Sequence, residues 1–432
     1  MRAIAIADSD SYIKWGAALL SQLPTEWSTE LVVVRTVKAP SSSQLATALS
    51  GSGIEPASVT FRDVADAVIH VASERPDVVL MATIGPLADI LTEAVVASAS
   101  PRPVIVSGLP GIGLPARRKA LLYRSQADLV VLHSTREIRR FSAIALANGL
   151  TQQFALASLP FLGSAGATTG GTDVIFAAQA IVPPLREQRV RLLGWLAELA
   201  HADATRRVVI KVRAVGTEQQ THAETDGYAD LLASEFPHAP ANLVVEGGPM
   251  AAHLAAASAL VTISSTAALE AIAVGVPVLA IDEFGVTPEL INEVFTGSGL
   301  LGSAEQLITG DFRLAEPDWL ADNYFHEKSA NTWIDALGAL VLANRVGMLP
   351  ARSRVIRGPG GSLRRAWDRK RALGSHDRSL IGYLALAVGT PARGLVLVLR
   401  DLHRVTADPR PVRQPIPLDD EAPALRGNRT NP

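Results

Sequence analysis

The 432-residue sequence contains no cysteine. This absence excludes a disulfide scaffold, a thiolate nucleophile, cysteine-ligated zinc and iron–sulfur clusters. Any chemistry must therefore rest on oxygen and nitrogen groups. Long apolar runs are also missing, since no stretch reaches the roughly 18 uninterrupted apolar residues that a membrane-spanning helix needs. The N-terminus turns polar at Asp8, too early for a signal peptide, so we expect a cytoplasmic protein.

A strong net charge is missing as well. The formal charge is −2, with 19% charged and 48% hydrophobic residues, which is typical of a globular protein and gives no sign of nucleic-acid binding. The length exceeds that of one ordinary domain and predicts two, each large enough to bury its own core.

Short apolar, β-branched segments alternate with longer helical patterns through most of the chain. This alternation predicts an α/β fold in which helices cover both faces of parallel sheets. Residues 1–162 predict an N-terminal Rossmann-like domain, whose expected strands are Ala3–Ala7, Glu30–Arg35, Asp77–Ala82, Pro103–Ser107, Asp128–His133 and Gln153–Ala157.

Ten small residues at 163–172 predict a linker, because they offer nothing to bury. Residues 173–350 repeat the pattern and predict a second Rossmann-like, doubly wound domain. Its expected strands are Asp173–Ala178, Arg207–Val212, Asn242–Glu246, Leu260–Ile263 and Pro277–Ile281. Ligands of open α/β sheets bind beyond the carboxyl ends of the strands, so we expect a site in a cleft between the two domains. In this architecture a terminal helix, here 329–346, often crosses back to the first domain.

The C-terminal extension, residues 351–406, is basic. Residues 352–413 hold fourteen Lys and Arg against four Asp, and they include an interrupted apolar stretch at 381–402. Two interpretations stay open: helices packed on the body with solvated arginines, or a segment that lies on an anionic membrane surface. Residues 407–432, rich in Pro, Asp and Arg, predict a disordered tail.

A hydroxyl-rich turn at Ser264, Ser265 and Thr266 stands between an expected strand and a helix. Hydroxyls and the first amides of a helix can bind a phosphate together, but the same residues also serve as ordinary helix caps. Glu270 follows one turn later, where its carboxylate can accept hydrogen bonds from a ribose or sugar hydroxyl. The alternative for Glu270 is a partly buried carboxylate satisfied by local amides.

The serine pair, Glu270-Ala271 and the turn at 275–277, in this order, resemble the donor-binding motif of bacterial capsule-type glycosyltransferases. These are the Kdo transferases, the bacterial polysialyltransferases and, more distantly, the CDP-glycerol glycerophosphotransferases. The resemblance covers residues 173–284. The whole chain is also similar to an actinobacterial group described only in general terms as glycosyltransferases. This resemblance implies the two-domain GT-B fold.

In those families a Lys-x-His-Pro pattern faces the nucleotide phosphates. The matching positions here are Lys211 and Arg213, which the resemblance implies as donor-phosphate ligands; Arg-Ala replaces His-Pro. Arginine can bind a phosphate with two hydrogen bonds but cannot shuttle a proton as histidine does. The alternative is two solvated residues at a strand end.

Further candidates follow other strands. Glu246 and Gly247 end a second-domain strand, where they either line a ribose or sugar site or form a simple turn. Asp8 and Asp10 follow the first strand, and either could act as base for the acceptor hydroxyl or cap the next helix. A Gly- and Pro-rich loop with Gly111, Gly113 and Arg117 could receive an anionic acceptor.

The sequence therefore predicts a metal-independent glycosyltransferase without a cofactor. Its partners would be a nucleotide sugar, for which the resemblance favours a CMP-activated nonulosonic or Kdo-type sugar, and a glycan or lipid-linked cell-surface acceptor. Two alternatives stay open: a polyol-phosphate transferase of the CDP-glycerol type, and a non-catalytic protein of the same fold that binds a nucleotide or glycan.

Overall fold

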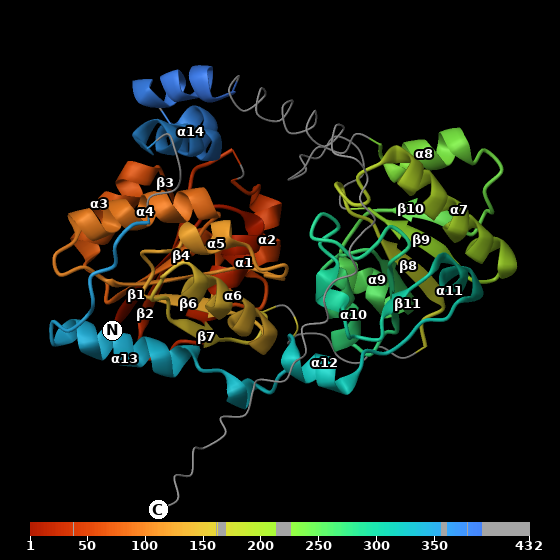
Figure 1. The fold of residues 1–432 in the computed structure, drawn as a ribbon, viewed down its shortest axis with the longest axis horizontal. Helices are drawn as coiled ribbons and strands as arrows, with labels where there is room; N and C mark the ends of the chain where they lie inside the picture. The colour runs from red at the N-terminus through yellow and green to blue at the C-terminus, as the bar shows by residue number, and fades with distance from the viewer. Residues whose placement is uncertain are drawn as a thin grey trace, which may run out of the picture.

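The computed structural model describes residues 1–37, 39–160, 162, 170–212, 226–355, 361–377 and 379–390. These residues form two α/β domains, each built on one parallel sheet (Figure 1). The polypeptide crosses between the domains near residue 160 and returns to the first domain through α13 (Trp333–Arg345).

The first domain contains a seven-stranded sheet of order β3-β2-β1-β4-β5-β6-β7, in which every neighbouring pair is parallel. Its strands are β1 (Arg2–Ala7), β2 (Ser28–Val34), β3 (Thr60–Arg62), β4 (Val78–Ala82), β5 (Val104–Gly108), β6 (Leu129–Leu132) and β7 (Phe154–Leu156).

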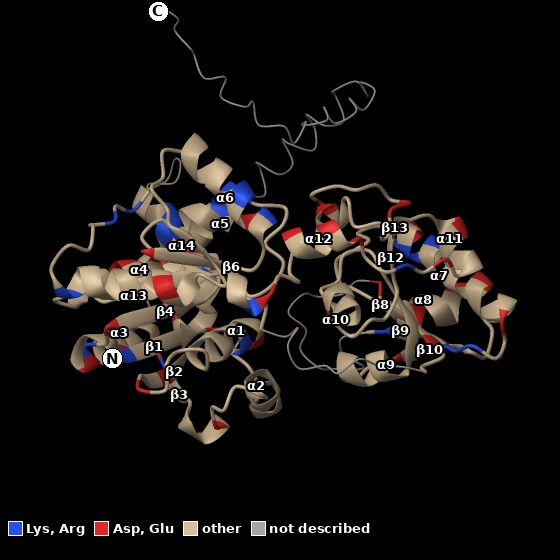
Figure 2. Ribbon diagram, turned by 90° about the horizontal axis from the view of Figure 1, so that it is seen from below, with Lys and Arg blue, Asp and Glu red and all other residues tan. Residues whose placement is uncertain are grey.

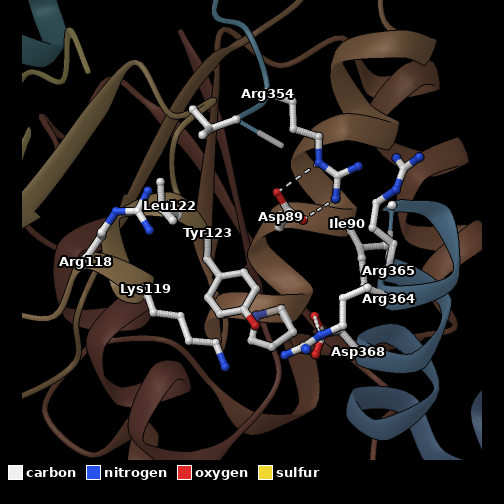
Figure 3. A pocket seen from close by; sticks show the side chains of 13 residues that line it. Asp89, Ile90, Arg118, Lys119, Leu122, Tyr123, Arg354, Arg364, Arg365 and Asp368 are labelled. Carbon is white, nitrogen blue, oxygen red and sulfur yellow. Dashed lines mark hydrogen bonds and ion pairs between the residues drawn. The ribbon is translucent and has the colours of Figure 1, made fainter. Parts of the chain in front are cut away.

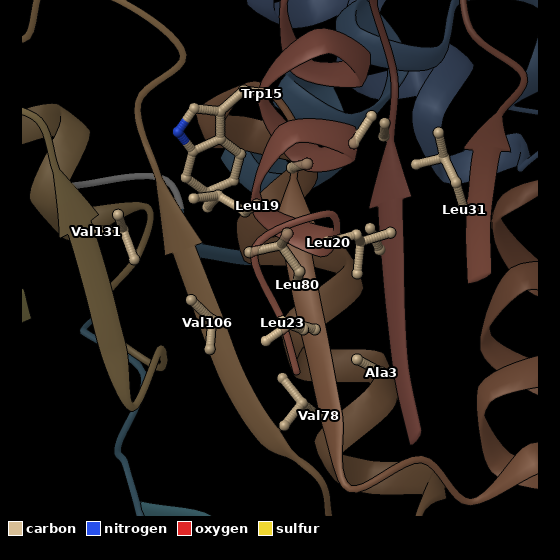
Figure 4. Packing of buried hydrophobic residues seen from close by; sticks show 14 of the residues in the cluster. Ala3, Trp15, Leu19, Leu20, Leu23, Leu31, Val78, Leu80, Val106 and Val131 are labelled. Carbon is tan, nitrogen blue, oxygen red and sulfur yellow. The ribbon is translucent and has the colours of Figure 1, made fainter. Parts of the chain in front are cut away.

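Helices cover both faces of this sheet. On one face α1, α2 and α13 pack in a shared apolar core, part of which Figure 4 shows; on the other lie α3, α4, α5 and α6. The helices are α1 (Asp10–Leu20), α2 (Ser42–Leu49), α3 (Val64–Glu74), α4 (Gly85–Ser98), α5 (Arg118–Leu122) and α6 (Thr135–Ala147), with a 3₁₀ turn at Pro56–Ser58.

Alternation along β1 divides its side chains between the two cores. Alanines at 3, 5 and 7 face α1, whereas Ile4 and Ile6 face the other layer, as the two-residue period of a strand requires. Because the side chains on this face of β1 are alanines, α1 can approach the sheet closely. A Cβ on Gly16 of α1 would lie 3.1 Å from the Ala82 Cβ, so this contact has no space for a larger residue.

The second domain contains a six-stranded sheet of order β10-β9-β8-β11-β12-β13, also parallel throughout. Its strands are β8 (Asp173–Ala177), β9 (Val208–Lys211), β10 (Leu243–Glu246), β11 (Ala257–Thr262), β12 (Val278–Ile281) and β13 (Leu301–Gly302).

Two apolar cores flank this second sheet. The helices are α7 (Arg186–Ala202), α8 (Tyr228–Glu235), α9 (Met250–Ala256), α10 (Ala267–Ala273), α11 (Ala304–Thr309) and α12 (Pro317–Asp322), with 3₁₀ turns at Glu293–Phe295 and Lys328–Ala330. Trp319 of α12 lies in the core that also holds Leu114 from the first domain, so the domains share apolar contacts.

Helix α13 crosses back to the first domain. Trp333, Leu337 and Leu340 pack in the core beneath α1, and the Trp333 indole donates to Gln22 Oε1 at 3.0 Å. The sequence analysis includes this helix in residues 173–350 but expects it to cross back to the first domain, and in the structure it packs in the first core. Its apolar stripe fits the face of the sheet that α1 and α2 leave uncovered.

The C-terminal extension also lies on the first domain. Helix α14 (Gly361–Leu373) contacts α4, and a 3₁₀ turn at Gly374–His376 leads to a helical stretch at 380–390, which we call the outer helix. Residues 163–169 of the expected linker, and the expected tail at 407–432, lie outside the described residues. In the described ranges, no helix is both long and apolar enough to cross a membrane.

Candidate functional site

The two domains face each other through loops that follow their central strands. A Cβ placed on Gly111, in the loop after β5, would lie 3.8 Å from the Thr266 Cγ2 atom after β11. The Arg117 guanidinium, from the same loop, donates to the Pro288 carbonyl of the second domain at 3.2 Å. The expected acceptor loop therefore lies against the expected phosphate turn.

Within that turn, two serines are engaged by their own domain. The backbone N–H and hydroxyl of Ser264 donate to Gln179 Oε1 at 3.0 and 3.1 Å, and the Ser264 side chain is buried. Ser265 Oγ accepts from the Ala267 N–H at 3.2 Å. Ser265 thus caps the start of α10, and its hydroxyl hydrogen remains the one group it can donate to a ligand.

Thr266 differs from both serines. In the part of the chain that the structure describes, neither its backbone N–H nor its hydroxyl has a hydrogen-bond partner, although the residue is partly buried. Polar groups that lose water in a folded protein are normally paired. Thr266 therefore has two donors without a partner in the described part of the chain, and its Cγ2 methyl lies near the loop of the first domain.

Glu270 lies one turn further along α10 and is partly buried. Desolvation raises the pKa of its carboxyl group, and the charges of Lys14 from α1 and Lys211 from β9 act in the opposite direction. Lys211 is itself buried at the end of its strand. A partly buried carboxyl group whose pKa is shifted by burial and by charges from both domains is a common mark of a functional site.

The remaining second-domain candidates are spread more widely. Arg213 lies outside the described residues. The Glu246 carboxylate bonds to Arg207 at 2.5 Å, and Arg207 also contacts Asp173, where β8 starts. Glu246 is therefore held along the sheet edge rather than toward Thr266. The Gly247 carbonyl accepts from His253 Nε2 at 2.7 Å.

The two aspartates after β1 differ in their surroundings. Asp8 is buried, and its carboxylate accepts from the Ile84 N–H at 3.1 Å and from the Ser9 hydroxyl at 3.1 Å. It thereby anchors the start of α4. Asp10 is exposed at the first residue of α1 and accepts from the Ser11 N–H at 2.8 Å.

Sequence reasoning missed Glu137, a buried carboxylate in the first turn of α6. It accepts from the Gly113 N–H at 2.6 Å, the His133 N–H at 2.9 Å and the Tyr324 hydroxyl at 2.6 Å. Burial nevertheless raises its pKa. The N–H of Gly113 is therefore bonded within the protein. No local sequence pattern predicts the role of Glu137, because its partner Tyr324 lies 187 residues away in the chain.

His133, at the end of β6, was also missed. Trp15 Nε1 donates to His133 Nε2 at 2.8 Å, and His133 Nδ1 lies 2.8 Å from the Ala157 carbonyl. His133 Nε2 also lies 3.0 Å from the Leu109 carbonyl. The tautomer with the proton on Nδ1 lets Nε2 accept from the indole and Nδ1 donate to Ala157. Burial lowers the pKa of His133 to about 4, which keeps the ring neutral near pH 7.

A separate basic pocket of about 610 Å³ lies on the first domain among α4, α5 and α14 (Figure 3). Its lining includes five cations against two carboxylates. The cations are Arg118, Lys119, Arg354, Arg364 and Arg365, and the carboxylates are Asp89 and Asp368. Arg354 bridges Asp89 and Glu93, which secures the chain after α13 to α4. Over the described ranges, no group of three His, Asp or Glu side chains is placed to hold a metal ion.

Two facing Rossmann-like domains, with polar loops meeting at their strand ends, define the GT-B class of nucleotide-sugar enzymes. The chain belongs to the family described as "Putative glycosyltransferase (DUF6716)", which matches residues 3–340. The prediction that the chain is a glycosyltransferase is therefore confirmed at the level of the family. The comparison with curated proteins finds no match.

Solved structures support the fold. The chain is similar to a UDP-N-acetylglucosamine 2-epimerase structure from Listeria monocytogenes, with a TM-score of 0.50, 15% identity, and coverage of 83% of this chain and 99% of that one. It is also similar to the S. aureus MnaA–UDP structure, with a TM-score of 0.51, 11% identity, and coverage of 82% and 100%. At these identities the likeness shows the fold alone. The finer resemblance to capsule-type families stays a prediction.

Proposed function

We propose that this chain transfers a sugar from a nucleotide sugar to a glycan or lipid-linked precursor of the cell surface, in the cytoplasm and without a metal. One observation carries the proposal: the charges of Lys14 and Lys211 act on the Glu270 carboxyl, one turn after Thr266, whose two donors have no partner among the described residues. Such a grouping fits a ligand that carries both phosphate and hydroxyl groups.

The donor phosphates would bind beside Lys211. The Thr266 N–H and hydroxyl, the Ser265 hydroxyl and Lys211 together supply donors and positive charge where a nucleotide leaving group becomes more negative. Arg213 would add a second cation, and Ser264 would support the turn through Gln179. Fixed donors of this kind stabilise a phosphate leaving group without a metal ion.

Glu270 would accept hydrogen bonds from the ribose or the sugar. Its raised pKa and its lack of a hydrogen-bond partner among the described residues both favour a ligand hydroxyl as its partner. Glu246 and Gly247 would lie further out along the sheet, toward the nucleotide.

The acceptor would approach from the first domain along Gly111, Gly113 and Arg117. Of the two aspartates after β1, Asp10 suits the role of base better, because it is exposed while Asp8 holds the Ile84 amide. A base must reach the hydroxyl whose proton it takes, and an exposed carboxylate at a domain face can do so.

The donor nucleotide defines the test. The resemblance to capsule-type families favours CMP as the donor nucleotide. UDP is the main alternative, since it is named in the similar S. aureus structure. Binding of CDP would indicate a polyol-phosphate transferase. Thermal-shift measurements with CMP, UDP, CDP and GDP should give stabilisation by one of them. The Thr266→Val and Lys211→Gln variants should lose that stabilisation, whereas Asp10→Ala should keep it.

Product analysis with the matching nucleotide sugar then separates the alternatives. Transfer to an added glycan acceptor, lost in Asp10→Ala, supports the proposal. Nucleotide binding without turnover would indicate the non-catalytic alternative, and an epimerised nucleotide sugar as sole product would contradict transfer.

A further inference from the structure

The outer helix, residues 380–390, has an unusual distribution of side chains. Its inward face consists of Gly382, Ala385 and Gly389, and Ala385 is fully buried against Trp367 of α14. A Cβ on Gly389 would lie 2.5 Å from Trp367 Cδ1, so only glycine fits at this contact. The helix thus binds the protein through its smallest residues.

The large apolar side chains of the same helix point outward. They are Leu380, Ile381, Tyr383, Leu384, Leu386 and Val388, exposed by 81, 61, 52, 63, 37 and 57%. A helix that serves only to cover a soluble core turns such residues inward. Lys370 Nζ of α14 lies 3.4 Å from the centroid of the Tyr383 ring, and the six side chains together leave an exposed apolar surface on this helix.

Cations border this surface. Helix α14, which packs against the outer helix, holds five cations, Arg364, Arg365, Arg369, Lys370 and Arg371, against one Asp within its own length. Lys370 is buried, and the other cations are partly neutralised, because Arg364, Arg365 and Arg369 pair with Asp368, Glu93 and Asp377. Figure 2 shows basic segments, in blue, on α14 and on other helices of the first domain. Arg364 and Arg371 lie over the Trp367 ring, 5.1 and 4.6 Å from its centroid.

We infer that the outer helix and α14 together form a membrane-docking surface for anionic phospholipid. Leu380, Ile381 and Leu384 enter the acyl region, and Tyr383 lies at the interface, where its half-polar ring is favoured. The arginines of α14 contact the phosphate headgroups. The inference extends the proposed function, by placing the enzyme where a lipid-linked acceptor would be found, but it does not depend on the nucleotide site.

A second copy of the chain fits this surface less well than a lipid surface. A twofold dimer through the same face would bring Arg364, Arg365 and Arg371 of both copies together, and like charges at an interface oppose association. Anionic headgroups complement the same arginines. The position of the outer helix also favours a lipid surface, because the helix lies beyond α14 on the outside of the first domain, away from the facing loops (Figure 1).

The basic pocket strengthens the assignment. Arg364 and Arg365 of α14 line it together with Arg118 and Lys119 of α5 (Figure 3). A phosphate group at the membrane surface would therefore meet cations from both helices. The pocket and the apolar helix are joined through α14, so docking would present the pocket to the headgroup layer.

The test uses the full chain and sedimentation with phosphatidylcholine vesicles, with or without phosphatidylglycerol. Wild-type protein should bind the anionic vesicles, and more weakly at high salt. The double variant Ile381→Glu/Leu384→Glu should bind about tenfold more weakly or worse, because two inserted side chains are lost. Both positions are more than half exposed, so its thermal unfolding should match wild type.

A matched control carries the same charge change elsewhere. Leu146 of α6 and Leu342 of α13 are 84 and 65% exposed, and Leu146→Glu/Leu342→Glu should bind vesicles as wild type does. Equal loss in both double variants would overturn the inference, since net charge alone would then explain it. No binding by wild type would overturn it too, as would a wild-type dimer that only the first double variant dissociates.

Discussion

The Tyr324 hydroxyl donates a 2.6 Å hydrogen bond to Glu137 Oε1, joining the two domains through a buried carboxylate. Both side chains are almost fully buried. The same oxygen accepts from the Gly113 N–H, so one carboxylate fixes the acceptor loop and the second domain together. The geometry of the facing loops therefore depends on this contact.

The Tyr324→Phe variant should destabilise the protein markedly. It removes one donor to a buried carboxyl group, and the loss of a partner by a buried polar group typically costs about 1–3 kcal/mol. Urea unfolding should show a lower midpoint. Arg139→Gln is the control: Arg139 also crosses to the second domain, pairing with Asp322 at 2.6 Å, but its side chain is 59% exposed. An exposed pair contributes only about 0.2–1 kcal/mol, so equal losses in the two variants would mean that burial does not strengthen the Tyr324–Glu137 contact.

Glu270→Gln should leave the ligand-free protein at least as stable as wild type at pH 7. Burial raises the pKa of Glu270, so the folded state disfavours the ionised carboxylate relative to the unfolded state. The stability difference between the two proteins should shrink as the pH falls toward the unfolded pKa of Glu. Nucleotide-sugar turnover should fall strongly. A variant that is less stable at pH 7 and fully active would show that Glu270 has a structural role.

His133 should make the unfolding free energy depend on pH. Its folded pKa is about 4 and its unfolded pKa about 6.5, so the unfolded state binds the extra proton first. Stability is complete above pH 6.5 and is lost as the pH falls toward 4, by about 3 kcal/mol. Urea unfolding of wild type and His133→Gln between pH 7 and 4 should show a shallower loss in the variant. If the unfolding free energies of the two proteins fell in parallel with pH, His133 would not be buried in its neutral form.

The sheets were predictable from the sequence because their strands are apolar runs of at least three residues flanked by turns. All six strands expected in residues 1–162 occur in the structure, as do the five expected in residues 173–350. The two strands that were missed, β3 and β13, have three and two residues. Neither has the apolar run that identifies β7, an edge strand of three residues, because β3 is Thr-Phe-Arg and β13 is Leu-Gly.

The site was predictable only in part. The turn after β11 and Glu270 stand out locally, since strand, hydroxyls and helix follow one another in sequence. The sequence could not show which residue of the turn caps the helix and which is available to a ligand. In the structure Ser265 caps α10, whereas both donors of Thr266 lack a partner in the described part of the chain. The pairing of Glu137 with Tyr324, and the position of Lys14 opposite Glu270, arise from tertiary contacts between segments far apart in the chain.

The two glycines of the acceptor loop should respond differently to substitution by alanine. A Cβ on Gly111 would meet only Thr266 Cγ2 at 3.8 Å among the described atoms, an ordinary contact, whereas a Cβ on Gly113 would lie 3.0 Å from Glu137 Oε1 and from Leu109 Cδ1. Overpacking of this kind costs about 1–3 kcal/mol. Gly113→Ala should therefore lower the thermal midpoint, while Gly111→Ala should leave it close to wild type.

Larger residues at Gly111 then test the role of the loop. Because the position faces Thr266 across the two domains, Gly111→Phe should fill the space in which donor and acceptor would meet. Folding should be retained, since Gly111 is only partly buried, and turnover should fall more than nucleotide binding does. Unchanged turnover in a folded Gly111→Phe variant would place the reaction elsewhere, because an aromatic side chain between the facing loops would obstruct any substrate held there.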